Sequence, residues 1–472
     1  MIPQTSSAVA RARDAAILSA ARTRQVSGAS AAAISAFACL LLLAPALWNR
    51  YPLLQYDTGG YLARWYEGYL VPSRSTVFGI YLHFGEGLHF WPQAAMQCIL
   101  TVWILSLVLR VFGVFRPGVL LAISAVLAVA TTLPWLTSIL LTDIFVGLSV
   151  LALHLLLFHS TALERWEKAG LFVLIAFAAA THSATLATLL AVLGAAAFAS
   201  YKIVKGLVPT GRLLRSLAAL AAGALMLLSA NAALSGQFAW TPGGYGILFG
   251  RMLQDGIVTR FLKEHCPSPS YKLCPYAREL PKTADEFLWG YSVFNDLGRF
   301  TGLGNEMRDI VLRSLAEYPL QQMSTAASAT GRQLVMVATG AGVHDQLPHT
   351  YAIIERFIPD EVPAMRAARQ QHGALNFDDL NLLHVPVALG STLLLGILLL
   401  RLRRRPHDDI GLLAASVAVA ILSNAFTCGA LSGPHDRYGA RMAWVATFVI
   451  ALYAARVISK SWHFRFRPKS TG

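Results

Sequence analysis

Long apolar runs dominate this chain and limit it to one class of fold. Read with a window of about 19 residues, ten segments are candidates for crossing a bilayer. Only 14% of the residues are charged, against about 25% in soluble domains. The sequence therefore predicts an all-α, polytopic membrane protein with about ten transmembrane helices, and it excludes a soluble enzyme and a disordered chain. The segments are 32–49, 93–113, 118–139, 142–160, 169–182, 183–201, 214–234, 382–400, 410–428 and 441–458.

The positive charge of the chain indicates its orientation. In a soluble protein, a net charge of +14 would suggest a nucleic-acid partner. With a cytoplasmic N-terminus, however, the inside segments hold 21 basic and five acidic residues, and 18 basic and 20 acidic residues remain. A basic excess on the cytoplasmic side is the usual rule. We therefore expect a multi-pass protein of a bacterial inner membrane, with both termini cytoplasmic and no nucleic-acid partner.

Two of the apolar runs allow alternatives. The run 169–201 would reach about 50 Å as a helix, which is too long for one ~30 Å crossing and short for two. Because Lys168 and Lys202 both belong inside, the chain crosses twice and turns near 181–183, with spans that are short or partly re-entrant. The run 32–49 resembles a signal peptide, but its removal would leave an odd number of spans.

The spans divide the chain into five parts. Residues 50–92, the first outer loop, are dense in Tyr and Trp, which suits short helices lying in the membrane interface. The segment 235–381 is long enough for a folded periplasmic domain, and its patterning predicts mostly α structure. The parts are a basic cytoplasmic tail (1–31), a transmembrane module of about seven spans (32–234), the periplasmic domain (235–381), the last three spans (382–458) and a second basic cytoplasmic tail (459–472).

Two of the five cysteines lie in the predicted periplasmic domain. Cys266 and Cys274 close a short, proline-rich loop. On the oxidising side of an inner membrane, this pair predicts a disulfide. A zinc site that uses His265 is the alternative, but it needs more ligands than this spacing offers.

Ionisable side chains gather at the predicted outer ends of the spans, where charge is costly and usually functional. A carboxylate there can act as a general base, while guanidinium groups bind phosphate in a bidentate manner. The candidates are Asp57 after the first span, Arg74 in the first outer loop, Asp143 between the third and fourth spans, His182 between the fifth and sixth, and His435, Arg437 and Arg441 at the entrance of the last.

Several of these residues also have a structural interpretation. Asp57 can be a solvated loop acid, and the two glycines at 59–60 would let the backbone turn sharply beside it. Asp143 can cap the helix that follows it, and His182 can be a hydrogen-bonded turn residue. Arg437 and Arg441, one helical turn apart, can be interfacial anchors.

The arrangement resembles the GT-C fold of integral-membrane glycosyltransferases, a group that includes aminoarabinose, galacturonic acid and protein O-mannosyl transferases. The resemblance covers mainly 32–234. It is carried by Asp57 soon after the first span, the long outer loop, Asp143 in the next outer turn, and paired short spans broken by the polar turn at 180–183. The resemblance implies an inverting transfer from a polyprenyl-phosphate-linked sugar to a periplasmic glycan or lipid acceptor, among membrane lipids.

In that family Asp57 would be the catalytic base, and Asp143 would position the acceptor or a divalent cation, Mg²⁺ or Mn²⁺. Arg74, His182, His435, Arg437 and Arg441 would then be candidate ligands of the substrate or its phosphate. Position 59, two residues after Asp57, is a glycine and not a second acid, so the Asp-x-Asp metal-binding pair is absent. Whether the protein uses a metal ion is left open by the sequence. The segment 265–290 also resembles an outer loop of proteobacterial membrane proteins, which assigns no chemistry.

Two other classes of function are compatible with such a chain. One is a transporter or flippase of a lipid-linked saccharide, but transporters favour charge at the bilayer midplane and internal repeats. The other is a different carrier-lipid enzyme, such as a glycan polymerase, ligase or acyltransferase, with His182 or His435 as its base. The gathering of charge at one surface favours an enzyme.

Overall fold

The computed structural model describes residues 28–68, 70, 73–241, 244–405 and 407–465, so most of the two predicted basic tails lies outside the described residues. Every regular element in these ranges is a helix, and the β pairing found there is one isolated bridge between Leu53 and Ile139. The prediction of an all-α chain is confirmed.

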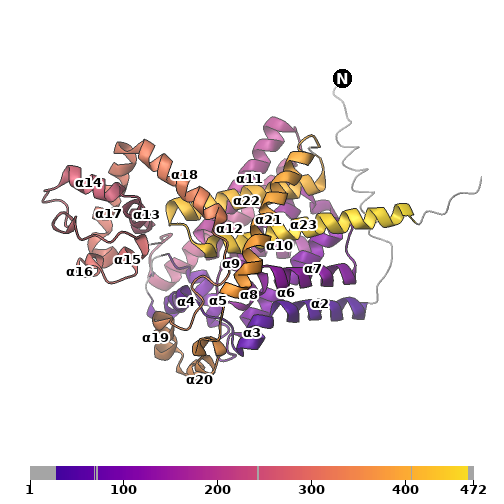
Figure 1. Ribbon diagram of the computed structural model, residues 1–472, viewed down its shortest axis with the longest axis horizontal. Coiled ribbons are helices and arrows are strands. Elements are labelled where there is room, and N and C mark those ends of the chain that lie inside the picture. The colour runs from indigo at the N-terminus through magenta and orange to yellow at the C-terminus, as the bar shows by residue number, and fades with distance from the viewer. Residues whose placement is uncertain (1–27, 69, 71–72, 242–243, 406, 466–472) are drawn as a thin grey trace, which may run out of the picture.

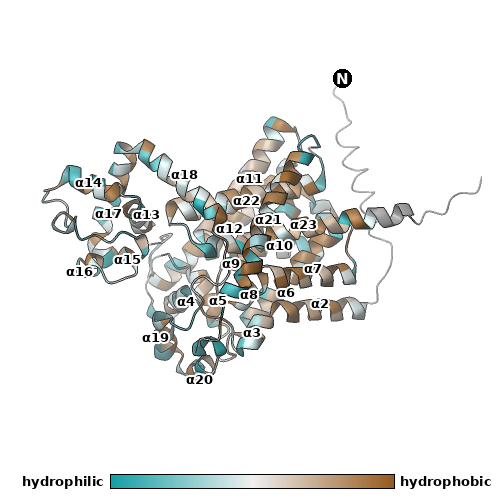
Figure 2. Ribbon diagram, in the orientation of Figure 1, coloured by the Kyte–Doolittle hydropathy of each residue, from teal (hydrophilic) through white to brown (hydrophobic). Residues whose placement is uncertain are grey.

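Six of the described helices are long and apolar enough to cross a bilayer, which indicates a multi-pass membrane protein. Figure 2 shows apolar residues along these helices and more polar ones in the helices beyond them. The six are α6 (Trp91–Val111), α11 (Ser183–Phe198, continued to Ile203), α12 (Thr210–Ser235), α21 (Asp378–Leu402), α22 (Asp409–Leu431) and α23 (Asp436–Arg465).

The remaining predicted spans coincide with shorter helices. The run 32–49 forms α2 (Gly28–Leu42) and α3 (Ala44–Asn49), and 118–139 forms α7 (Pro117–Ala130) and α8 (Leu133–Ser138). The run 169–201 breaks at His182, between α10 (Arg165–Thr181) and α11, where the sequence predicts a turn. By length, therefore, six spans are supported, and the count of ten stays a prediction.

Helix α9 (Asp143–Phe158) lies at the centre of the bundle. Its residues 143–157 are buried, and it contacts α6, α10 and α23. A helix that is apolar all round belongs in such a core. A Cβ atom at Gly147 would lie 2.6 Å from the Trp444 ring, so the glycine lets α9 approach α23 closely. This contact brings the N-terminal ends of α9 and α23 together.

The predicted periplasmic domain contains a unit with its own core. Residues 244–318 form the helices α13 to α17 and stand apart from the bundle, at the left of Figure 1. Cys266 and Cys274 are disulfide-bonded in this unit, with an S–S distance of 2.00 Å, so the predicted pairing is confirmed. The helices are α13 (Gly244–Gln254), α14 (Ile257–His265), α15 (Ala284–Leu288), α16 (Val293–Asp296) and α17 (Arg299–Glu317).

The rest of that segment packs on the transmembrane part. Helix α18 (Pro319–Val335) packs against α22, and α19 (Pro348–Phe357) packs against α4 (Tyr56–Glu67), which belongs to the first outer loop together with α5 (Thr76–His83). Apolar residues from α19 and from α20 (Val362–Arg366) join the same core as the transmembrane helices. They therefore cover the end of the bundle where α4 and α9 begin.

Candidate functional site

Asp57 and Asp143 lie at one end of the bundle, where a short pairing of two loops holds them. The Leu53 C=O accepts a hydrogen bond from the Leu140 N–H (3.0 Å), and the Thr58 hydroxyl donates to the Leu140 C=O (3.1 Å). These bonds fix the start of α4 against the chain that leads into α9. Two carboxylates far apart in the sequence thereby come to one place.

The glycines beside Asp57 have another role than the predicted one. Gly59 and Gly60 lie inside α4, and neither has a positive φ, so the expected sharp turn is wrong. A Cβ atom at Gly59 would lie 2.5 Å from the Thr350 Cα, and one at Gly60 would lie 3.2 Å from the Arg74 Nε. The glycines instead let α19 and the Arg74 side chain lie directly against α4.

Arg437 connects the two acids. Its Nη1 donates to Asp57 Oδ2 and its Nε to Asp143 Oδ2, each at 2.5 Å. Arg74 pairs with the other Asp57 oxygen, and the Arg441 Nη1 lies 3.1 Å from Asp143 Oδ1. The cluster holds two carboxylates and three guanidinium groups, so its formal charge is +1 and every carboxylate oxygen is engaged. A net positive site favours an anionic ligand.

The cluster has a buried and an accessible side. The side chains of Asp143 and Arg441 are 1% and 0% exposed, whereas those of Arg437, Arg74 and Asp57 are 12%, 17% and 19% exposed. A ligand arriving from the aqueous side therefore meets Arg74, Arg437 and Asp57 first.

Arg441 is held from behind by α22. It donates to Asn424 Oδ1 (2.7 and 3.0 Å) and to Cys428 Sγ (3.1 Å) as well as to Asp143. With its donors turned into the protein, Arg441 fixes Asp143 in place. Asp143 itself is in the first turn of α9, after Thr142 as the N-cap residue, which makes no side-chain cap bond.

The electrostatic environment keeps Asp57 ionised. Burial raises the pKa of its carboxyl, but the guanidinium groups of Arg74 and Arg437 outweigh burial and lower the pKa to about 2. Asp57 is therefore a weak base while both arginines are paired with it. Any ligand that draws the guanidinium groups away makes the carboxylate more basic.

The two predicted histidines lie in different places. His182 interacts electrostatically with Asp57 and Asp143, and its Nδ1 is buried without a hydrogen-bond partner. His435 pairs instead with the 244–318 unit, with Nε2 3.6 Å from an Asp285 oxygen. The structure thus brings His182 to the site and places His435 at the junction with that unit.

Three residues near the cluster escape the sequence analysis. Asn424 is a polar side chain within the apolar run 410–428, a signal that could have drawn attention to it. His349, from α19, and Trp289, after α15, carry no such signal, because nothing local shows that these segments reach α4. Burial lowers the pKa of His349, and the positive charge of Arg74 lowers it further.

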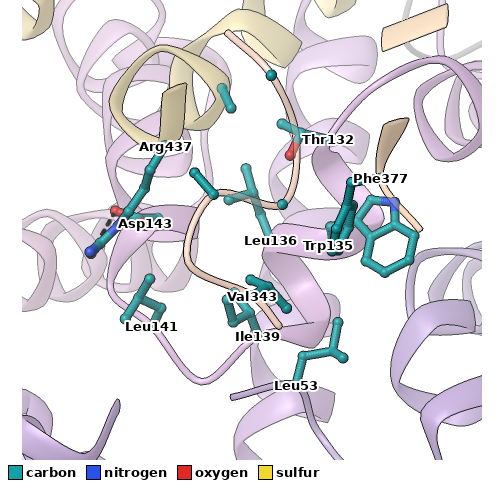
Figure 3. A pocket seen from close by; sticks show the side chains of 14 residues that line it. Leu53, Thr132, Trp135, Leu136, Ile139, Leu141, Asp143, Val343, Phe377 and Arg437 are labelled. Carbon is teal, nitrogen blue, oxygen red and sulfur yellow. Dashed lines mark hydrogen bonds and ion pairs between the residues drawn. The ribbon is translucent and has the colours of Figure 1, made fainter. Parts of the chain in front are cut away.

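An apolar pocket adjoins the cluster. Its cavity volume is about 30 Å³, which is room for only a few water molecules. Figure 3 shows Asp143 and Arg437 at one end and apolar side chains, among them Leu136 and Ile139, along the rest. Apolar walls with a charged end suit the chemistry of an amphiphilic ligand, but a cavity of this size has to open to admit one.

The acids of the cluster do not fit a divalent cation in this arrangement. Both oxygens of Asp57 and both of Asp143 face guanidinium groups, which repel a cation. Within the described ranges, no group of three or more His, Cys, Asp or Glu side chains could hold a metal ion.

Comparisons of the chain with protein-family models, with curated proteins and with solved structures give no match. The resemblance to GT-C glycosyltransferases therefore stays a prediction.

Proposed function

We propose that this protein transfers a sugar from a polyprenyl-phosphate donor to a glycan or lipid acceptor at the periplasmic face of the inner membrane. The observation that carries the proposal is the Asp57–Arg437–Asp143 bridge at the end of an apolar pocket. Guanidinium groups bind phosphate in a bidentate manner. The apolar walls beside the bridge suit the apolar chain next to that phosphate, for which the pocket has to open.

The donor phosphate would bind to Arg74 and Arg437, the two partly exposed arginines of the cluster. Both now hold the Asp57 carboxylate. As they turn to the phosphate, the pKa of Asp57 rises from its low value. The base becomes competent only when the donor is bound, which limits unproductive reactions.

The transfer itself then needs one displacement. Asp57 accepts the proton of the acceptor hydroxyl while the hydroxyl oxygen attacks the anomeric carbon. The bond between that carbon and the phosphate oxygen breaks, and its electron pair leaves with the lipid phosphate. Arg74 and Arg437 stabilise the charge that develops on the leaving phosphate. Attack opposite to the leaving group inverts the anomeric configuration.

The buried residues act through their neighbours. Asp143 and Arg441 position Arg437, and Asn424 in turn orients Arg441. The buried Nδ1 of His182 has no hydrogen-bond partner, and in this proposal it would bind a hydroxyl of the acceptor. We propose a transfer that needs no divalent cation, since the arginines supply the positive charge.

The test uses purified protein in lipid nanodiscs with undecaprenyl-phosphate-linked glucose, mannose and 4-amino-4-deoxyarabinose as donors. Release of undecaprenyl phosphate is measured with a lipid extract as acceptor. Asp57→Asn is expected to lower the rate by at least about 100-fold, the usual effect of losing a general base. The matched control is Asp296→Asn, an exposed acid of α16.

Two outcomes would overturn the proposal. If the native protein consumes none of the donors, sugar transfer is wrong; movement of an intact donor across the membrane would instead indicate a flippase. If Asp57→Asn keeps the native rate, another group is the base.

A further inference from the structure

An exposed tryptophan of the 244–318 unit lies at the mouth of the cluster. The indole ring of Trp289, directly after α15, has its centroid 5.8 Å from the Arg74 guanidinium carbon. Arg74 also lies 5.7 Å from the centre of the Tyr61 ring and pairs with Asp57. The side chain that neutralises Asp57 is therefore held between two aromatic rings, one from each part of the molecule.

The backbone that carries the indole is well defined. The Trp289 backbone N–H donates to the Asp285 C=O (2.8 Å), and a Cβ atom at Gly290 would lie 2.6 Å from the Glu286 C=O, so the chain turns tightly here. Arg299 donates to the Leu288 C=O (2.9 Å). These contacts hold the backbone, while the ring itself lies against Arg74 and the Phe300 ring, whose centroid is 6.1 Å away.

Nevertheless, Trp289 is 47% exposed, whereas the aromatic residues that fill the core of its unit, such as Phe249 and Phe287, are fully buried. A large ring that is this open to water contributes little to the hydrophobic core. It offers apolar area to a ligand, and its few rotatable bonds make binding cost little side-chain entropy. The Arg74 guanidinium lies against this ring, and His349 interacts electrostatically with Arg74 and Asp57.

We propose that Trp289 is a stacking platform for a saccharide ring of the substrate. The apolar C–H face of a pyranose would pack on the open part of the indole, and its hydroxyls would meet the polar groups around Arg74. The inference rests on the proposed function and specifies which part of the 244–318 unit contacts the sugar. An interfacial membrane anchor, the other common use of an exposed tryptophan, is one outcome of the test.

The test measures binding without transfer, so its failure is distinguishable from the failure of the proposed function. The protein is labelled with 5-fluorotryptophan in nanodiscs, and Trp289→Phe identifies the ¹⁹F resonance of Trp289. The probes are the methyl glycosides of glucose, galactose, mannose and arabinose. At least one probe is expected to shift this resonance in a saturable manner. Tyr291→Ala, which removes an 87% exposed ring two residues away, should leave that shift unchanged.

Three outcomes would overturn the inference: no glycoside shifts the resonance, Tyr291→Ala removes the shift, or nitroxide-labelled lipids broaden the resonance and so place the ring in the membrane. Where transfer is measurable, Trp289→Ala should raise the KM for the saccharide substrate about three- to tenfold at little cost to kcat. Trp289→Tyr should restore most of that loss; an equal loss in both variants would indicate a structural role.

Discussion

The Arg437 guanidinium lies 2.5 Å from an Asp57 carboxylate oxygen, across 380 residues of sequence. Asp57 belongs to the first turn of α4 and Arg437 to the first turn of α23. Their contact depends on two separate packing contacts. Helix α4 packs on the chain that precedes α9, and α23 packs on α9. The cluster therefore forms only when both ends of the chain are correctly folded.

Removal of Arg437 should destabilise the protein strongly. Arg437→Gln leaves Asp57 with one guanidinium partner and Asp143, which is 1% exposed, with only Arg441. Breaking such buried pairs typically costs about 3–5 kcal/mol. Thermal unfolding in nanodiscs should show a large decrease of the melting temperature. The control is Arg366→Gln, whose pair with Glu355 is exposed and is worth about 0–1 kcal/mol. Equal effects of the two variants would contradict a stabilising role of the cluster.

The pH dependence of transfer should change when Arg74 is removed. In the free protein the pKa of Asp57 is about 2, so the carboxylate stays ionised and kcat/KM should show no acid limb from it between about pH 4 and pH 7. In Arg74→Gln one of the two charges that lower the pKa is gone, whereas burial still raises it. The pKa therefore moves upward, and an acid limb enters the kcat/KM profile.

This profile is measured with native protein and with Arg74→Gln at saturating acceptor. Protonation of Asp57 lowers activity, so the loss must occur as the pH falls and not as it rises. An unchanged profile in the variant would mean that Arg74 does not control the base.

The main parts of the candidate site follow from the sequence because charge is rare in this chain. Once the spans are assigned, Asp57, Asp143 and Arg437 fall at the same depth, and the structure brings these three together. The contribution of Arg441 is less predictable, since its burial depends on Asn424 in a neighbouring helix.

Long-range packing limits what the sequence can predict. Judged from its immediate neighbours, a glycine pair predicts a turn. In the structure Gly59 lies inside α4, where its missing side chain lets α19 pack closely on the helix. Likewise, the segment that follows residue 318 reads as part of one periplasmic domain, whereas its apolar residues join the transmembrane core. Which core an amphipathic helix joins is decided by partners distant in the sequence.

Gly59→Ala should weaken the protein by displacing α19. Its Cβ atom would lie 2.5 Å from the Thr350 Cα, a backbone atom that cannot move alone. Overpacking of this kind costs about 1–3 kcal/mol, and the shift also disturbs the start of α4 beside Asp57. Melting temperature and transfer rate should both decrease. Gly304→Ala in α17, where a Cβ atom meets nothing within 4 Å, should instead be neutral or stabilising by about 0.5–1 kcal/mol.

Transfer should survive the removal of divalent cations. The carboxylate oxygens of Asp57 and Asp143 already face guanidinium groups, so the site offers no ligands to Mg²⁺ or Mn²⁺. Incubation with EDTA should leave the rate within about twofold of the untreated protein, a change of only a few tenths of a kcal/mol in the barrier. Loss of activity that added Mg²⁺ or Mn²⁺ restores would show that the cluster rearranges around a metal.

The disulfide provides a test of orientation. Disulfides persist on the oxidising side of the inner membrane and are rare in the cytoplasm. The protein from cells is unfolded in denaturant and treated with a maleimide reagent. Cys266 and Cys274 should react only after reduction. The free thiols of Cys39, Cys98 and Cys428 should react without reduction. The double variant Cys266→Ser, Cys274→Ser should lower the stability of the 244–318 unit by about 2–3 kcal/mol, as expected for a short closed loop. If both cysteines react without reduction, the predicted orientation is wrong, and the candidate site would face the cytoplasm.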